Sequence, residues 1–104
     1  MYKLEYYKDY AILYVNESAY AEIRPWYSRF TNANLDIEWE INQFGYNRSA
    51  YCSNNSLRKC INNFVHSRRD KMSSEDVNIS DEDENKLHKL YETYLSNVIM
   101  KKLK

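Results

Sequence analysis

The sequence of residues 34–42 is NLDIEWEIN, in which polar and apolar side chains alternate without a break. In an extended chain, successive side chains point to opposite faces. The four apolar residues therefore share one face, and the carboxylates and amides share the other. A period of two is typical of a β-strand with one buried and one solvated face. The stretch predicts an amphipathic strand whose inner face carries Leu35, Ile37, Trp39 and Ile41.

The chain on either side of this stretch also favours strands. Runs at 2–7 and 10–15 are rich in aromatic and β-branched residues, and the Lys8-Asp9 pair between them predicts a hairpin. Turn-forming residues at 16–18, 31–34 and 44–47 separate further short strands near 19–24 and 49–52. Residues 18–30 also carry apolar side chains at helical spacing. Pro25 argues against one unbroken helix, so we favour a strand there and leave the helix open.

The second half of the chain shows helical spacing instead. After Ser56, a good N-cap residue, apolar side chains recur at i, i+3, i+4, i+7 and i+8 through Val65. The same spacing runs from Leu87 to Ile99. Ser80 precedes an acidic first turn, and lysines close the end, which suits the helix dipole. We expect helices over 56–69 and 80–103, joined by a polar linker at 70–79.

These patterns predict an α+β fold. We expect an antiparallel sheet of four to five strands from residues 1–52, packed against two C-terminal helices. At 104 residues the chain is expected to form a single domain, residues 1–104, with one shared core. The core would combine the inner face of 35–41 with the apolar stripes of both helices.

Composition narrows the class of function. The chain has a single glycine, which argues against a glycine-rich phosphate-binding loop, and it shows no catalytic motif. We expect no enzymatic activity and no cofactor. The eleven tyrosines point to recognition, because a tyrosine offers a large apolar ring, a polar tip and little side-chain entropy to lose. Part of this excess follows from AT-rich codon usage, which also favours asparagine, lysine and isoleucine.

Charge and cysteine content bear on location. The 15 basic and 15 acidic residues cancel overall, but residues 56–71 are net basic and 72–86 net acidic. There is no long apolar run for a membrane span, and Met1–Glu5 lacks the features of a signal peptide. We therefore expect a cytoplasmic protein with reduced thiols and no membrane association. Whether Cys52 and Cys60 pair in an oxidising environment stays open.

Two sets of possible metal ligands are better explained without a metal. Asp36, Glu38 and Glu40 would line one strand face, where a divalent cation site would also need a positioned lysine or histidine. A solvated, acidic strand face is the simpler interpretation. The spacing of the two cysteines and two histidines matches no zinc pattern. We expect no metal site.

The favoured function is protein binding. Nine of the eleven tyrosines lie in residues 1–52, more than the core of a small sheet can hold. The composition suggests a small inhibitor or accessory factor from a phage or other mobile element, acting on a nucleic-acid-handling host protein. Aromatic residues would anchor this partner, and acidic residues would steer a basic surface toward it. The predicted binding residues are Tyr6, Tyr10, Tyr14, Trp26, Tyr27, Asp36, Glu38 and Glu40.

The alternative is a nucleic-acid-binding module. Basic side chains cluster on and just after the first predicted helix, where they could contact phosphates. A helix face that pairs with the neighbouring acidic stretch explains the same residues. The residues of this alternative are Arg58, Lys59, Arg68, Arg69 and Lys71.

Overall fold

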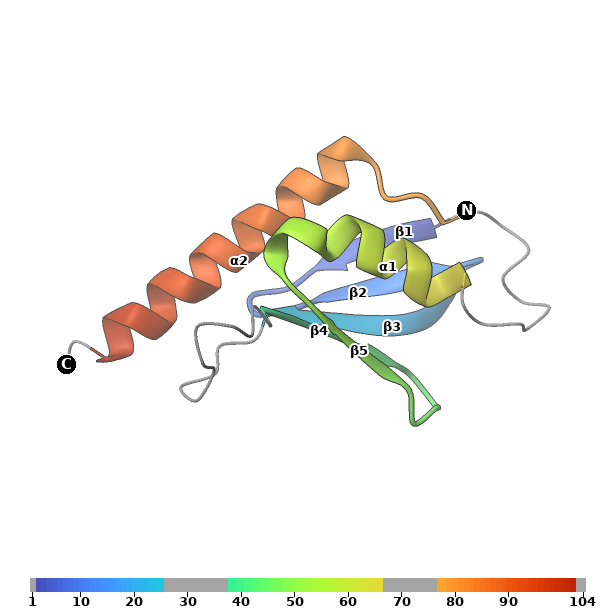
Figure 1. The fold of residues 1–104 in the computed structure, drawn as a ribbon, viewed down its shortest axis with the longest axis horizontal. Coiled ribbons are helices and arrows are strands. Elements are labelled where there is room, and N and C mark those ends of the chain that lie inside the picture. The colour runs from blue at the N-terminus through green and yellow to red at the C-terminus, as the bar shows by residue number, and fades with distance from the viewer. Residues whose placement is uncertain (1, 26–37, 67–76, 103–104) are drawn as a thin grey trace.

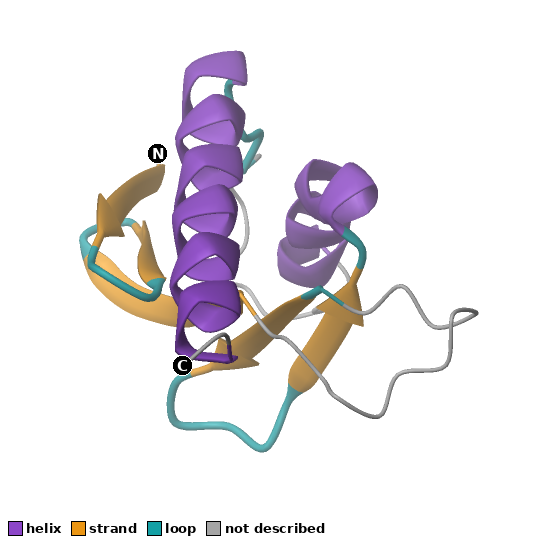
Figure 2. Cartoon of the chain, turned by 90° about the vertical axis from the view of Figure 1, so that its left-hand side faces the viewer, coloured by secondary structure: helices purple, strands orange, loops and turns teal. Residues whose placement is uncertain are grey.

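The computed structural model describes residues 2–25, 38–66 and 77–102, with the backbone alone for 98–102. Five antiparallel strands form one sheet in the order β1-β2-β3-β4-β5, and both α-helices lie on the same side of it (Figures 1 and 2). The predicted α+β class and the strand count are confirmed. The elements are β1 (Tyr2–Tyr6), β2 (Ala11–Val15), β3 (Ser18–Pro25), β4 (Trp39–Gln43), β5 (Ser49–Cys52), the 3₁₀ turn η1 (Asn54–Ser56), α1 (Leu57–His66) and α2 (Asp81–Lys102).

Three hairpin turns connect neighbouring strands at the predicted places. The β1–β2 turn closes with a hydrogen bond of 2.8 Å from the Tyr7 amide to the Tyr10 carbonyl. The β2–β3 turn has positive φ at Asn16 (51°) and Glu17 (69°), the backbone that a two-residue turn needs to match the twist of the strands. The only glycine of the chain, Gly45 (φ 76°), serves the β4–β5 turn in the same way.

Strand β3 resolves the ambiguity of residues 18–30 as far as Pro25, which is the last residue of the strand. Residues 26–30 lie outside the described residues. The alternation predicted for 34–42 is confirmed in β4, where Trp39 and Ile41 are fully buried and Glu40 and Asn42 are half exposed. Leu35 and Ile37 lie outside the described part of the chain.

One hydrophobic core lies between the sheet and the helices. It joins the inner residues of all five strands to α1 and α2, and Trp39 at its centre packs on Tyr91 with ring centroids 5.7 Å apart. Each large apolar side chain removed from water contributes about 1.5–3 kcal/mol. The largest fully buried members from the regular elements are Leu13, Ile23, Trp39, Ile41, Leu57, Ile61, Val65 and Leu87.

The two helices begin differently. The predicted cap of α2 is confirmed, because the Ser80 hydroxyl accepts a hydrogen bond of 3.2 Å from the Asp83 amide. The predicted cap of α1 is wrong: Ser56 is the last residue of η1, which runs directly into α1, and the Ser56 hydroxyl donates to the Ser53 carbonyl at 3.3 Å. Among the described residues, neither helix has the length and apolar character that a bilayer span requires.

The segment before α2 is more than a polar linker. Val77 and Ile79 are buried in the core, with relative exposures of 1% and 0%. The segment is held on α1 by the Asn62 side chain, which accepts from the Ile79 amide at 3.3 Å, and by His66, whose ring lies 3.2 Å from the Val77 carbonyl. The apolar residues of 77–79 therefore act as core residues outside any regular element.

Candidate protein-binding face of the sheet

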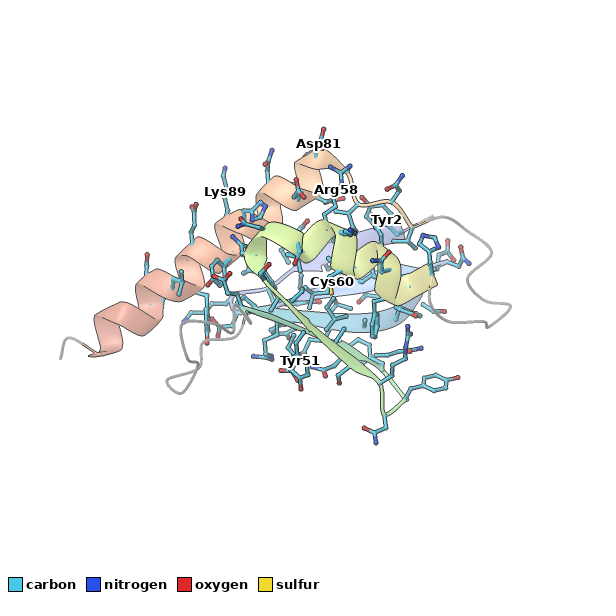
Figure 3. The ribbon with its side chains drawn as sticks, viewed as in Figure 1. Tyr2, Tyr51, Arg58, Cys60, Asp81 and Lys89 are labelled. Carbon is cyan, nitrogen blue, oxygen red and sulfur yellow. The ribbon has the colours of Figure 1, made fainter. Side chains whose placement is uncertain are left out.

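In the described structure, both helices cover one face of the sheet, and the opposite face carries the second set of alternating side chains. Figure 3 shows Tyr51 beneath the sheet, on the side away from Arg58 and Cys60. We call this surface the open face. Its residues are Lys3, Glu5, Tyr7, Tyr10, Ile12, Tyr14, Glu22, Arg24, Glu40, Asn42, Ser49 and Tyr51.

A row of side chains crosses the open face from the β1–β2 turn to β5. The rings of Tyr7 and Tyr10 are stacked, with centroids 4.9 Å apart and planes 13° from parallel. The Arg24 guanidinium lies 5.0 Å from the centre of the Tyr10 ring. In the strand register, Arg24 of β3 lies opposite Glu40 of β4, and Glu40 lies opposite Tyr51 of β5. We call these five residues the aromatic row.

Glu5 organises the rings at the β1–β2 end of the open face. Its carboxylate accepts hydrogen bonds from the hydroxyls of Tyr7 (3.0 Å) and Tyr14 (3.1 Å) and from the Lys3 ammonium (3.1 Å). These bonds, that of Lys3 foremost, lower the pKa of the Glu5 carboxyl. The bonds to Glu5 also raise the pKa values of Tyr7 and Tyr14. At neutral pH the acceptor is thus charged and both donors keep their protons.

The charges of the open face are mixed. Two cations, Lys3 and Arg24, lie among three carboxylates, Glu5, Glu22 and Glu40. Arg24 donates a 2.7 Å hydrogen bond to Glu22, and this bond raises the pKa of the guanidinium. A surface of this kind does not concentrate positive charge, so it is poorly suited to a phosphate backbone.

The structure brings only part of the predicted binding set together. Tyr10, Tyr14 and Glu40 lie on the open face. Tyr6 lies on the inner face, half-buried against the core, and its hydroxyl donates to an Asp83 carboxylate oxygen at 2.8 Å. The other predicted binding residues, Trp26, Tyr27 and Asp36, lie outside the described residues.

The prediction that Glu38 and Glu40 present one solvated acidic face is wrong. Glu38 precedes β4, and its carboxylate accepts hydrogen bonds from the Asn54 amide (3.1 Å) and from the Tyr91 hydroxyl. Burial, and then the bond to Glu38, raise the pKa of Tyr91. Glu38 therefore ties the start of β4 to η1 and α2, because its carboxylate has turned away from the open face.

Sequence reasoning missed Tyr7, Arg24 and Tyr51. All three lie on the open face, and two of them are strongly exposed, Tyr7 at 42% and Tyr51 at 54%. The sequence could have revealed them, because alternate residues of a strand face the same side of the sheet. A buried Leu4 places Tyr2 and Tyr6 inward and Glu5 and Tyr7 outward, and a buried Cys52 places Tyr51 outward.

The basic segment is partly neutralised. Arg58 lies 2.6 Å from an Asp81 carboxylate oxygen and 3.9 Å from one of Glu84, the contact between α1 and the start of α2 labelled in Figure 3. Lys59 is exposed. Arg68, Arg69 and Lys71 lie outside the described residues. The pairing of Arg58 with the acidic stretch accounts for this basic residue without a nucleic-acid partner.

The cysteines and histidines do not gather in one place that suits a metal. His66 contacts the Val77 carbonyl, and His88 Nδ1 lies 3.0 Å from Asn54 Oδ1. Within the described residues, no three side chains of histidine, cysteine, aspartate or glutamate are grouped so as to hold an ion. Asn54 Oδ1 also accepts a 2.8 Å hydrogen bond from the Trp39 indole, so His88 belongs to a structural network around the core tryptophan.

Comparisons with protein-family models, curated proteins and solved structures found no match for this chain.

Proposed function

We propose that this chain is a non-enzymatic protein-binding module that engages its partner through the open face of the sheet. The observation that carries the proposal is the aromatic row. Its five residues follow one another across a face that no described helix covers, through ring contacts from Tyr7 to Arg24 and through strand register from Arg24 to Tyr51. Exposed aromatic residues and arginine are the residue types that most often dominate binding energy at protein interfaces.

Three members of the aromatic row, Tyr7, Tyr10 and Arg24, are held by contacts within the free protein. Tyr7 is held by stacking on Tyr10 and by its hydrogen bond to Glu5. Arg24 is held by Glu22 and by the Tyr10 ring. Ordering a flexible side chain on binding costs about 0.5–1.5 kcal/mol, and this cost is reduced where contacts within the free protein already restrict the side chain. Such pre-ordering supports a recognition role for the row.

The mixed charge of the open face favours a protein over a nucleic acid. The three carboxylates outnumber the two cations there, and Arg58, from the basic segment, is paired with Asp81. Glu40 and Glu22 would complement basic side chains on a partner. This supports the narrower proposal of an inhibitor or accessory factor that binds a basic surface, such as that of a nucleic-acid-handling host protein.

The test uses two tyrosines of similar exposure in different places. Tyr51 lies on the open face and is 54% exposed, and Tyr46 lies in the β4–β5 turn and is 57% exposed. A photo-crosslinking aromatic residue replaces one or the other in a tagged full-length chain, which is then expressed in its natural host. We expect a discrete crosslinked protein with the probe at position 51 and not with the probe at position 46.

The captured protein is then titrated with purified variants. Tyr51→Ala should weaken binding about tenfold or more, the usual effect of removing an interface hot spot, whereas Tyr46→Ala should leave it nearly unchanged. If Tyr51→Ala and Tyr7→Ala both bind as tightly as Tyr46→Ala, the open face is not the interface. Oligonucleotide binding that falls steeply with salt would support the nucleic-acid alternative instead.

A further inference from the structure

The two cysteines of the chain meet at the junction of the sheet and α1. Cys52 is the last residue of β5, and Cys60 lies one turn into α1. Their side chains line the same groove between these two elements, where each thiol shifts the pKa of the other. Both cysteines are free thiols, so two reduced groups lie in one groove. A dithiol is already assembled by the fold and needs no large movement to bring the sulfurs together.

The two thiols differ in their access to solvent. A groove of about 540 Å³ runs between β5 and α1, and its lining includes Cys52, Lys59, Cys60 and Asn63. Cys60 is half-exposed, while Cys52 is buried at 9%. Figure 3 shows the Cys60 sulfur between α1 and the sheet. A small solute entering the groove therefore meets Cys60 before Cys52.

The thiols also differ in reactivity. The hydrogen bond from the Cys52 thiol lowers the pKa of Cys60, since it stabilises a thiolate there. The same hydrogen bond, together with burial and the nearby Glu38 carboxylate, raises the pKa of Cys52. The thiolate is the nucleophilic form of cysteine, so access and ionisation both select Cys60 as the sulfur that reacts first.

We infer that Cys52 and Cys60 form a peroxide-reactive modification site, in which Cys60 is oxidised first and Cys52 closes a disulfide with it. The Cys60 thiolate attacks one oxygen of a hydroperoxide, the O–O bond breaks, and the other oxygen leaves as hydroxide or alkoxide, which takes up a proton. Cys60 is then a sulfenic acid. The Cys52 sulfur attacks the Cys60 sulfur, the S–O bond breaks, and the oxygen leaves with the Cys52 proton as water. Two electrons pass from the dithiol to the peroxide.

This site is separate from the proposed binding face. Cys52 points to the inner side of β5, whereas its neighbour Tyr51 points to the open face. The resulting disulfide would join the end of β5 to α1 across a loop that contains η1. The inference therefore stands or fails without reference to the partner of the open face.

The experiment treats the reduced full-length chain with a small excess of hydrogen peroxide and measures its intact mass after acid quenching. We expect the monomer to lose the mass of two hydrogens, and peptide mapping to find a disulfide between positions 52 and 60. The Cys52→Ser variant should form the sulfenic acid at Cys60 but no disulfide. Its mass should therefore increase by one oxygen, and dimedone should label Cys60. Cys60→Ser should leave Cys52 as a thiol under the same conditions.

A second measurement needs no substitution and therefore no assumption about how variants fold. The native reduced chain is alkylated with limiting iodoacetamide, and the label is mapped over time. We expect Cys60 to be labelled before Cys52. Labelling of Cys52 first, disulfide-linked dimers in place of the internal disulfide, or a wild-type chain that keeps both thiols in peroxide would each overturn the inference.

Discussion

The carboxylate of Asp83 fastens the start of α2 to strand β1, and its removal should destabilise the fold measurably. It accepts hydrogen bonds from the hydroxyls of Tyr2 and Tyr6, both at 2.8 Å, and from the Ser80 hydroxyl at 3.2 Å. The two tyrosines are more than seventy residues away in sequence. Burial, and then the bond to Asp83, raise the pKa of Tyr6, so this hydroxyl remains a donor at neutral pH.

The magnitude follows from the contacts that Asp83→Ala would remove. A hydrogen bond to a charged group contributes about 1.5–3 kcal/mol when buried. Tyr2 and Tyr6 are half-buried and regain water when the carboxylate is lost, so we take about 1 kcal/mol for each. A carboxylate in the first turn of a helix adds about 0.5 kcal/mol. We expect Asp83→Ala to lower the free energy of unfolding by about 2–3 kcal/mol.

Urea unfolding at neutral pH measures this change. The matched control is Glu82→Ala, one residue away in the same helical turn, whose side chain is 80% exposed and 3.5 Å from Lys86. An exposed pair of this kind contributes less than about 0.5 kcal/mol. Combining Asp83→Ala with Tyr6→Phe gives a double-mutant cycle, and we expect a coupling energy of about 1 kcal/mol between the two side chains.

Two results would contradict this reasoning. One is a coupling energy near zero, which would show that the Tyr6 hydroxyl gains nothing from the carboxylate. The other is an Asp83→Ala variant no less stable than Glu82→Ala. Either result would mean that apolar packing alone holds α2 against β1.

Three further changes test other parts of the fold by urea unfolding. Ile79→Ala should lower the free energy of unfolding by about 2–5 kcal/mol, as expected for a core residue, because Ile79 is fully buried. A decrease below about 1 kcal/mol would support the interpretation of 77–79 as a linker. Arg48→Lys should lower the free energy of unfolding by about 1–2 kcal/mol, since lysine cannot reproduce the hydrogen bonds to Tyr20 (3.1 Å), Gln43 (2.9 Å) and the Phe64 carbonyl. An unchanged urea midpoint would contradict this expectation. Tyr91 has its pKa raised above the ordinary 10.0 by burial and by Glu38, so the unfolded chain loses this proton at lower pH than the folded chain. Stability should be full below about pH 10 and fall above it, and Tyr91→Phe should make the fall shallower; equal slopes would refute the assignment.

Much of the fold could be predicted because its signals are local. The alternation around Trp39 and Ile41 specified a strand with a buried face, and the spacing after Leu57 specified a helix with a buried stripe. Ser80 and the acids that follow it located the start of α2. Each of these signals depends only on residues within one element, so one sequence is enough to recognise them.

The candidate site was harder to predict because it depends on which face of each strand is buried. Tyr6 and Tyr7 are neighbours, yet one binds Asp83 under α2 and the other stacks on Tyr10 on the open face. A shift of one residue in the register would exchange them. The meeting of Cys52 and Cys60 in one groove likewise depends on how tightly η1 turns the chain back onto β5, which the spacing of cysteines does not encode.

The tyrosine excess therefore has two physical explanations. Tyr2, Tyr6 and Tyr91 bury their rings partly or wholly against the core and use their hydroxyls to bind carboxylates that link the sheet to α2. In these positions a tyrosine does what a phenylalanine and a separate polar residue would otherwise do. On the open face, Tyr7 and Tyr14 bind Glu5 and Tyr10 contacts Arg24, and these partners belong to the same sheet. Contacts within one face order these rings without burying them, and an ordered but exposed ring is useful mainly to a second molecule. Binding energy should thus be lost on substitution at Tyr7 or Tyr51, and folding stability at Tyr2, Tyr6 or Tyr91.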